Sequence, residues 1–471
     1  MITVIIFTNG SHQKQKGQEM HHNLNTYPHY ETRPLPRNYL TALLIIGSAG
    51  LLAACHGEPA VLTAAPAAPQ TALVGKSDRI IFSAVPDNFP VAQDIAIIFP
   101  LHTDDRIKPS DRTNTGEPLL SEAWMQTVNN AYLNTVVEDA VEQENVYDDW
   151  RVVSVRFAPC GPLGHHFGQS PDQLCWPQVR IVWQPVLKDF MLFEHRPQYA
   201  DDRAIHALYH VMPAPEVIDT ETSHSFLRSA KEILADGHTT ESISEDSLNR
   251  FVEIRNAAIE RWTQLVLSLR TEGRAPGNTI DWRMELNSND EERVARFTNA
   301  LRKVFAEAAV PNNLFEMTAF SLPEGRQPAL LDLWTFLAFD GENGRIQQRD
   351  IVVRSPSDGA LVGNAGLDET VGMNIPDPEL IEEVRTSALA EELTSLAIFT
   401  QDDVTLLGQA INDPTQTLVP NTSCASCHRF NRLRFDFHNL SHLEDRELTI
   451  APRVVNDVVH ELKWLRDALG R

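Results

Sequence analysis

Several short stretches of the chain are runs of mainly apolar residues between polar segments, a pattern that predicts β-strands. We expect strands at two apolar runs within 79–100 and at 151–158, 178–186, 280–286, 313–321, 331–339 and 347–354. The last two stretches are separated by Gly341-Glu342-Asn343-Gly344. Glycine and asparagine at such a position favour a tight turn, so this pair predicts a β-hairpin.

Other stretches carry apolar residues three and four positions apart, which predicts amphipathic helices. These stretches are 119–142, 202–211, 222–236, 245–270, 290–308, 377–396, 401–411 and a final one with Val454, Val455, Val458, Val459, Leu462 and Leu465. Strands and helices follow one another without regular βαβ alternation, which favours an α+β fold. We expect one large mixed domain at 79–397 and a small helical segment at 398–471.

An apolar run at Tyr39–Ala54 is shorter than the roughly 20 residues that a comfortable membrane span requires. Arg33 and Arg37 precede it, as in the positive region of a signal peptide. The run ends in Leu52-Ala53-Ala54-Cys55, which resembles the lipobox of bacterial lipoproteins. The resemblance implies that residues 1–54 are an N-terminal extension and signal peptide, and that Cys55 is lipidated. The alternative is an uncleaved membrane anchor, and both interpretations imply export.

Residues 55–78 are rich in alanine and proline and lack apolar periodicity, which indicates a tether between the lipid and the folded domain. His56, rather than an aspartate, follows the cysteine. By resemblance to the sorting of lipoproteins in enteric bacteria, this residue favours the outer membrane. We therefore expect a protein of the cell envelope that is held on the membrane by its lipid and faces the periplasm or the cell surface.

The sequence Cys424-Ala425-Ser426-Cys427-His428 is the spacing used for attachment of a c-type haem. The pentapeptide resembles that of c-type cytochromes. The resemblance implies one covalent haem c, bound through Cys424 and Cys427, with His428 as the proximal ligand of the iron. It covers only this motif and its flanking helices. The alternatives are a zinc site and a disulfide between the two cysteines.

Single-haem cytochromes usually supply the second axial ligand from a methionine downstream of the motif, but here the last methionine, Met373, lies upstream. We expect His438 or His442 as the distal ligand because both can fold back within a short loop, and we rank them ahead of His460. The other candidates are Met373, an open iron position, and His206 and His210, which would lie four residues apart on the helix predicted at 202–211.

Cys160 and Cys175 are the remaining cysteines, with Gly, Pro and His residues between them. In an oxidising compartment they are expected to form a disulfide, which would stabilise the fold by roughly 3 kcal/mol. The alternative is a metal site that also uses His165 and His166. This scheme assigns a role to each of the five cysteines.

The chain has a formal net charge of -24, which argues against nucleic acid as a partner, since binding to phosphates requires a positive surface. An acidic surface is compatible with a basic redox protein as partner, although many acidic proteins have none. The leading hypothesis is an exported, lipid-anchored, monohaem electron-transfer protein. One alternative is a haem enzyme of the peroxidase or oxidoreductase type with an open distal site, and another is a scaffold lipoprotein without haem.

Overall fold

The computed structural model describes residues 89–99, 107–132, 147–163, 175–185, 204–235, 244–273, 276–321, 334–354, 361–364, 367–369, 450 and 452–469. The chain divides into two units, residues 1–78 and 79–471, and all of the described residues belong to the second. The helices described in this unit include none that is both long enough and apolar enough to cross a membrane.

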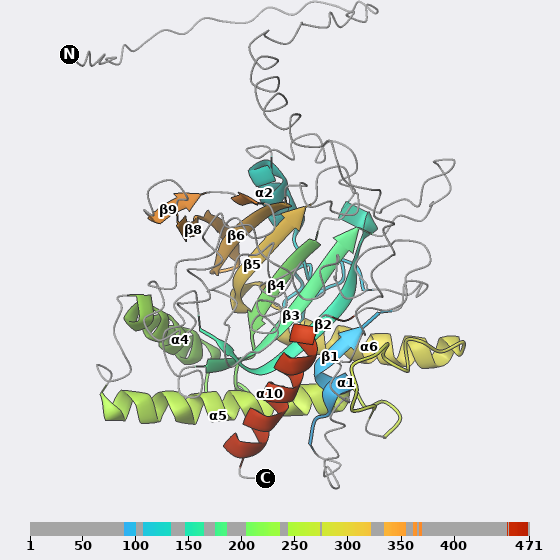
Figure 1. The fold of residues 1–471 in the computed structure, drawn as a ribbon. Coiled ribbons are helices and arrows are strands. Elements are labelled where there is room, and N and C mark those ends of the chain that lie inside the picture. Colours follow the sequence, from blue (N-terminus) through green and yellow to red (C-terminus); the bar gives the residue numbers. More distant parts are fainter. Residues whose placement is uncertain are drawn as a thin grey trace, which may run out of the picture. The chain divides into compact units, whose positions relative to one another are not determined.

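An eight-stranded sheet forms the centre of the described unit, with the order β1-β2-β3-β4-β5-β6-β10 and with β7 paired to β6 (Figure 1). Neighbouring strands are antiparallel throughout. The strands of this sheet are β1 (Ala96–Ile98), β2 (Trp150–Pro162), β3 (Cys175–Pro185), β4 (Ala204–His210), β5 (Leu314–Ser321), β6 (Trp334–Glu342), β7 (Arg345–Arg349) and β10 (Leu367–Glu369). A separate pair consists of β8 (Ile351–Arg354) and β9 (Leu361–Asn364).

Three of the longer helices are inserted between β4 and β5, and α5 runs across the ends of the strands (Figure 1). The helices are α1 (Ala92–Ile95), α2 (Glu122–Tyr132), α4 (Thr220–Ala235), α5 (Glu245–Ser268), α6 (Glu291–Ala308) and α10 (Pro452–Ala468), with short 3-10 helices η1 (Tyr147–Asp149) and η4 (Pro311–Asn313). Ser244 and Asp290 begin α5 and α6, because each side chain accepts a hydrogen bond from a first-turn amide. The described residues therefore have an α+β fold.

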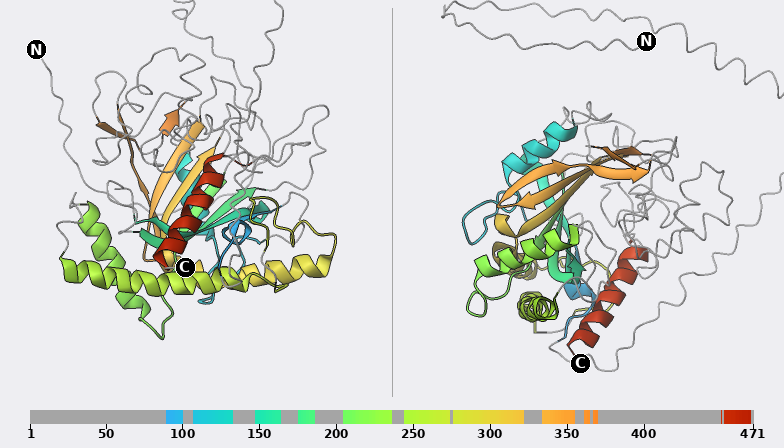
Figure 2. Two further views of the ribbon diagram at one scale, coloured as in Figure 1. Left: turned by 60° about the horizontal axis from the view of Figure 1, so that its bottom comes forward. Right: turned by 90° about the vertical axis from the view of Figure 1, so that its left-hand side faces the viewer.

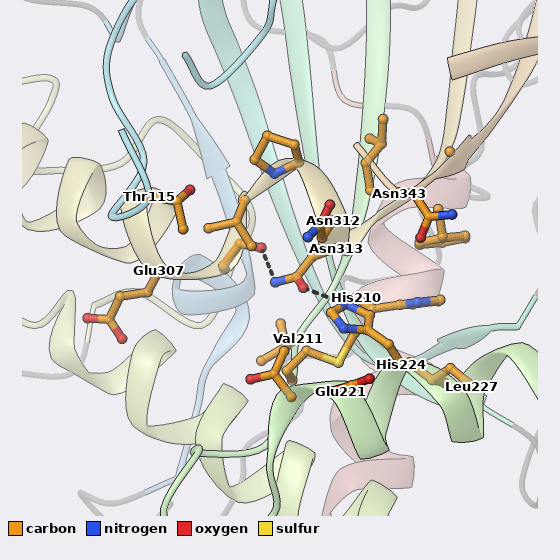
Figure 3. Close-up of a pocket in the computed structure, with 18 of the residues that line it drawn as sticks. Thr115, His210, Val211, Glu221, His224, Leu227, Glu307, Asn312, Asn313 and Asn343 are labelled. Atoms are coloured by element: carbon orange, nitrogen blue, oxygen red, sulfur yellow. Dashed lines mark hydrogen bonds between the residues drawn. The ribbon is translucent and has the colours of Figure 1, made fainter. Parts of the chain in front are cut away.

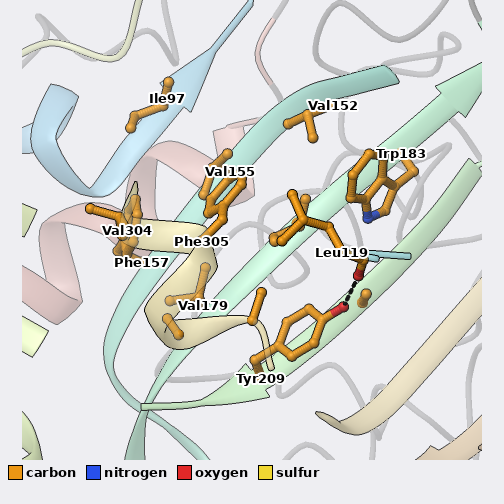
Figure 4. Close-up of a cluster of buried hydrophobic side chains, with 14 of the residues drawn as sticks. Ile97, Leu119, Val152, Val155, Phe157, Val179, Trp183, Tyr209, Val304 and Phe305 are labelled. Carbon is orange, nitrogen blue, oxygen red and sulfur yellow. Dashed lines mark hydrogen bonds between the residues drawn. The ribbon is translucent and has the colours of Figure 1, made fainter. Parts of the chain in front are cut away.

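The main core lies on one face of the sheet, where every second strand residue is apolar and buried (Figure 4). Figure 4 shows Val155 and Phe157 of β2 beside Val179 and Trp183 of β3. The phenol of Tyr209 donates a hydrogen bond to the Leu119 carbonyl at 2.9 Å, which satisfies a polar atom inside this core. Helices α2, α5 and α6 contribute further apolar side chains to the same cluster.

The helix α10 packs on β2 and α1, and its apolar residues join the same hydrophobic cluster. Val458, Leu462 and Leu465 are at most 2% exposed and belong to the same cluster as the strand residues. Figure 2 shows α10, in red, and α2 on opposite sides of the sheet. The amphipathic pattern predicted a helix here, and the structure places its apolar face against the large domain.

A buried ion network joins the beginning of the described chain to the turn after α5. The Arg283 guanidinium, with its side chain 0% exposed, donates to both Glu285 carboxylate oxygens at 2.8 and 3.1 Å. The Asp94 carboxylate is also fully buried and accepts from Arg270 Nη2 at 2.5 Å. These pairs give the buried charges opposite partners, as burial of a charge requires.

The hairpin predicted between 331–339 and 347–354 is present as β6 and β7. Asn343 and Gly344 form its two-residue turn, with φ angles of 50° and 73°, between the paired residues Glu342 and Arg345. Positive φ at both turn positions matches the right-handed twist of the strands and favours Asn-Gly. The Trp124 indole of α2 donates to the Gly344 carbonyl at 3.2 Å and fixes the turn.

Two predicted elements are wrong. Residues 202–211 were expected to be a helix, but 204–210 form the strand β4, in the middle of the sheet, with both of its faces largely buried. Residues 280–286 were expected to be a strand, but only Trp282 makes a bridge, to Ile98, and the chain then turns at Arg283. The stretch 347–354 is divided into two strands at Asp350.

The remaining predictions in the described part agree with the structure within a few residues at the element ends. The helices at 222–236, 245–270 and 290–308 correspond to α4, α5 and α6, and the one at 119–142 to α2 where the chain is described. The run at 94–100 forms β1 after a single helical turn, α1. The run at 79–85 and the helices at 377–396 and 401–411 lie outside the described residues.

Candidate ligand-binding site

A cavity of about 1330 Å³ lies where α4, the end of α6 and the β6–β7 hairpin surround the end of β4 (Figure 3). Small-molecule sites in proteins usually measure about 300–1,000 Å³, so this cavity is large enough for an organic ligand or a short extended chain. It is lined by side chains from segments far apart in the sequence, from Asn114 to Asn343. The cavity is therefore a product of the tertiary fold.

The interior of the cavity is apolar. Val211 and Met212 continue from β4, Leu227 comes from α4 and Leu265 from α5, and all four side chains are buried. They belong to the two hydrophobic clusters that hold the helices to the sheet. These walls are held by packing and present a preformed surface for an apolar group.

One polar wall of the cavity is built around a histidine. His224 Nε2 lies 3.1 Å from Oδ1 of the buried Asn313, and Asn313 Nδ2 donates to the Ala308 carbonyl at 3.1 Å. Because the amide nitrogen is donating to a carbonyl, Oδ1 is the acceptor and the imidazole donates from Nε2. Burial lowers the pKa of His224 below 6.5, and the hydrogen bond to Asn313 opposes this effect. The imidazole is therefore mainly neutral at pH 7.

His210 contributes a second ring. Its side chain is 3% exposed, and its imidazole stacks on Phe315 with ring centres 3.9 Å apart and planes inclined by 3°. The Trp176 indole lies edge-on to it at 6.5 Å and donates to the Val211 carbonyl. The packing of this ring on two aromatic residues fixes its orientation at the inner end of the cavity.

The charged residues that line the cavity are mainly acidic. Five are carboxylates and two are arginines: Glu117, Glu221, Glu307, Asp340 and Glu342, against Arg228 and Arg261. Arg261 pairs with Glu307, and Asp340 lies 3.5 Å from Arg349. A hydrogen bond from Thr115 lowers the pKa of Glu117, so that this exposed carboxylate is ionised at neutral pH.

The described residues provide no group of three or more His, Cys, Asp or Glu side chains arranged to hold a metal ion. The cavity instead combines an apolar interior, neutral hydrogen-bonding groups and an acidic margin. Such an arrangement can bind an organic molecule and orient it by charge.

Most residues of the sequence-predicted sites lie outside the described part of the chain: Cys55, His165, His166, Met373, Cys424, Cys427, His428, His438 and His442. His460 is described and lies exposed on α10. His206 and His210 lie on the same face of β4, with Leu208 between them on that face. At about 3.3 Å per residue they are separated by roughly 13 Å along the strand, so they lack the one-turn spacing that suits a shared metal ion.

The structure joins Cys160 and Cys175 in a disulfide, with their Cα atoms 4.9 Å apart. The two cysteines lie at the facing ends of β2 and β3, where Pro162 pairs with Cys175. The bond closes the connection between these two strands. Because both sulfur atoms are in the disulfide, neither is available for the alternative metal site with His165 and His166.

The cavity was not found from the sequence, because its lining residues carry no shared local motif. Four of them, His224, Asn312, Asn313 and Asn343, lie in three separate segments and meet only in the folded chain (Figure 3). No family model matches this chain, and neither the curated proteins nor the solved structures include a match to it.

Proposed function

We propose that this protein is an exported, lipid-anchored, monohaem c-type cytochrome-like protein that transfers electrons in the cell envelope. The observation that carries the proposal is the sequence Cys424-Ala-Ser-Cys-His428. Two thiols three residues apart match the two vinyl groups of one haem, and the adjacent imidazole is suited to the iron. A bound haem supplies reversible one-electron chemistry.

The role of each residue follows from the type of donor. Cys424 and Cys427 would form the thioether bonds, His428 would be the proximal ligand, and His438 or His442 would be the distal ligand. Two protein ligands on the iron suit a protein that only transfers electrons, because an iron saturated with protein ligands does not bind small molecules readily. An open position would instead favour the haem-enzyme alternative.

The disulfide between Cys160 and Cys175 supports the proposed location. Disulfides persist in the periplasm and at the cell surface but are rare in the reducing cytosol. Lipidation of Cys55 would hold the chain on a membrane, with the outer membrane favoured, and residues 55–78 would act as the tether. The net charge of -24 suits a basic redox protein as the partner.

The haem motif lies in the stretch of chain that connects β10 to α10. The strand β10 pairs with β6, and α10 packs on β2, so both flanks of this stretch are attached to the same sheet. A cofactor bound in this stretch would be linked to the sheet on two sides.

The test is to express the exported chain with haem-maturation machinery and to stain a denaturing gel for haem. We expect a stained band at the mass of the protein that is lost in Cys424→Ala. The matched control is the double variant Cys160→Ala/Cys175→Ala, which removes two cysteines outside the motif and should keep the stain. An unstained wild-type band would refute the haem proposal and favour the scaffold alternative.

The visible spectrum of the same sample tests the axial ligands. A low-spin iron that resists cyanide and carbon monoxide supports electron transfer, and replacement of the distal histidine, His438 or His442, should convert it to high spin. A high-spin wild-type iron that binds these ligands readily would favour the enzyme. Membrane attachment is tested separately with Cys55→Ser, which should release the protein into the soluble fraction.

A further inference from the structure

The proposed attachment of haem uses none of the residues that line the cavity beside α4. Helix α4, η4 and the β6–β7 turn nevertheless surround a preformed space of about 1330 Å³. Its interior is lined by the buried residues Val211, Met212 and Leu265, which belong to two hydrophobic clusters. These side chains cannot move into the space without disturbing the packing of those clusters. A ligand with an apolar body would fit this interior.

The charge at the margin indicates the polar part of such a ligand. Two of the carboxylates that line the cavity, Glu307 and Asp340, have arginine partners. The other charged side chains of the lining are three glutamates, Glu117, Glu221 and Glu342, and one arginine, Arg228. Within the described residues, these three glutamates form no ion pair. The last turn of α6 also ends at the cavity, and the C-terminal end of a helix dipole is negative. The margin therefore attracts positive charge.

An anionic ligand is disfavoured by the way α4 begins. The Asp219 carboxylate already accepts hydrogen bonds from the amide and the hydroxyl of Thr222, at 2.8 and 2.6 Å. This side chain occupies the position at the start of the helix that an anion would take. A metal cation is disfavoured because the described residues place no three metal-ligating side chains together.

From these observations, we propose that the cavity binds an organic cation, a primary ammonium or guanidinium group on an apolar body. Glu117 and Glu221 attract the charge, and the body lies against Val211, Met212 and Leu227. The cation has two sources with the same chemistry, a free amine and a lysine or arginine side chain of a peptide. This binding activity goes beyond electron transfer and does not depend on the haem.

Isothermal titration calorimetry of the full chain with matched probes tests the proposal. Phenethylamine supplies the ammonium group on an apolar body, 2-phenylethanol is neutral, and 3-phenylpropanoate is an anion. A second pair, the blocked peptides Leu-Lys-Leu and Leu-norleucine-Leu, supplies the same contrast on a peptide. We expect binding of the cationic member of at least one pair, with a preference over its neutral analogue that decreases at high salt. The pair that binds identifies the source.

Variants locate the binding. Glu117→Gln and Glu221→Gln should each weaken binding of the cation about threefold, and the double variant about tenfold, as expected for exposed charges. The matched control is Glu245→Gln, an exposed glutamate in the first turn of α5 that lies away from the cavity and should leave binding unchanged. Ser225→Trp places a large ring in the cavity from an exposed position of α4 and should abolish binding.

The folding of each variant is verified by its thermal unfolding transition. Equal affinity for the cation and its neutral analogue would overturn the proposal, as would absence of binding in both pairs. Binding that persists in folded Ser225→Trp would place the ligand elsewhere and would also overturn it. The haem stain is independent of all these results, so the failure of either proposal can be recognised separately.

Discussion

Arg156 of β2 donates a hydrogen bond to the Glu461 carboxylate of α10 at 2.7 Å, across 305 positions of sequence. The guanidinium also lies 3.5 Å from the Val454 carbonyl. These contacts hold α10 on the sheet at a point where both side chains are less than one-fifth exposed.

The burial of Glu461 predicts a pH dependence of stability. Burial raises the pKa of Glu461 from 4.5 to about 7, and Asp457 adds to this effect, whereas Arg156 and Arg180 oppose it. Between pH 4.5 and 7 the folded state keeps a proton that the unfolded chain has lost. The contribution of the protonated Glu461 to the free energy of unfolding is therefore complete below pH 4.5, and it is lost as the pH rises through 7.

Glu461→Gln isolates this contribution, because the amide keeps an acceptor for Arg156 but does not titrate. We expect the free energy of unfolding, measured by urea denaturation, to fall less between pH 4.5 and 7 in this variant than in the wild type. Glu253→Gln, which alters an exposed pair with Arg250, is the control and should follow the wild type. Parallel curves for all three proteins would contradict the prediction.

The buried ion network predicts a large loss of stability in Arg283→Met. The substitution leaves Glu285 buried without its guanidinium, and removal of one partner from a buried pair costs about 3–5 kcal/mol. Arg250→Met removes an exposed pair and should cost less than about 1 kcal/mol. Denaturant midpoints give both values, and similar losses in the two variants would show that burial does not determine the effect.

The β6–β7 turn predicts a smaller effect at Gly344. An alanine there would have to adopt φ near 73°, and its Cβ would lie 3.2 Å from Pro311 Cβ. We expect Gly344→Ala to destabilise the fold by about 1–2 kcal/mol. Asn343→Gly is the control, because glycine accepts the φ of 50° without strain. If the thermal midpoint of Gly344→Ala is equal to or above that of the control, the positive φ of Gly344 does not contribute to the stability of the turn.

The disulfide predicts a redox-dependent stability. Its two cysteines are 15 positions apart, and a closed loop of that size stabilises a fold by roughly 3 kcal/mol. We expect Cys160→Ser/Cys175→Ser to lose about this amount and to be insensitive to reductant, whereas reductant should lower the stability of the wild type to the same level. If reductant also destabilises the double variant, another thiol pair is responsible.

The elements that sequence patterns located well are those with a single buried face. Helix α6 is amphipathic and begins at the capping Asp290, so both its face and its start are visible in the sequence. The hairpin at Asn343-Gly344 is equally local, because its φ angles follow from two adjacent residues. In these segments the local preference and the tertiary packing agree.

The strand β4 was mistaken for a helix because it lies in the middle of the sheet. Ile205 and Tyr209 are buried on one face and Leu208 on the other, so the alternation of apolar and polar residues is lost. His206 and His210 then imitate a helical spacing of four. Trp282 and Arg283 show the opposite error, since their stretch resembles a strand but the guanidinium turns inward to Glu285.

The candidate site was even less accessible from the sequence. His224 and Asn313 are 89 positions apart, and neither carries a local signal of binding. The motif of the proposed haem attachment, in contrast, is a contiguous pentapeptide that the sequence alone reveals, although it lies outside the described residues. This motif consists of residues close together in the sequence, whereas the cavity consists of residues that only the fold brings together.

The position of α10 has a consequence for biosynthesis. Its residues Val458, Leu462 and Leu465 share a core with Ile95 and Ile97, near the start of the described domain. If the chain is exported from its N-terminus as proposed, Cys424 and Cys427 cross the membrane before α10 does, while the core is still incomplete. In that case the two thiols are accessible for the proposed attachment of haem before α10 arrives, and the domain completes its core only afterwards.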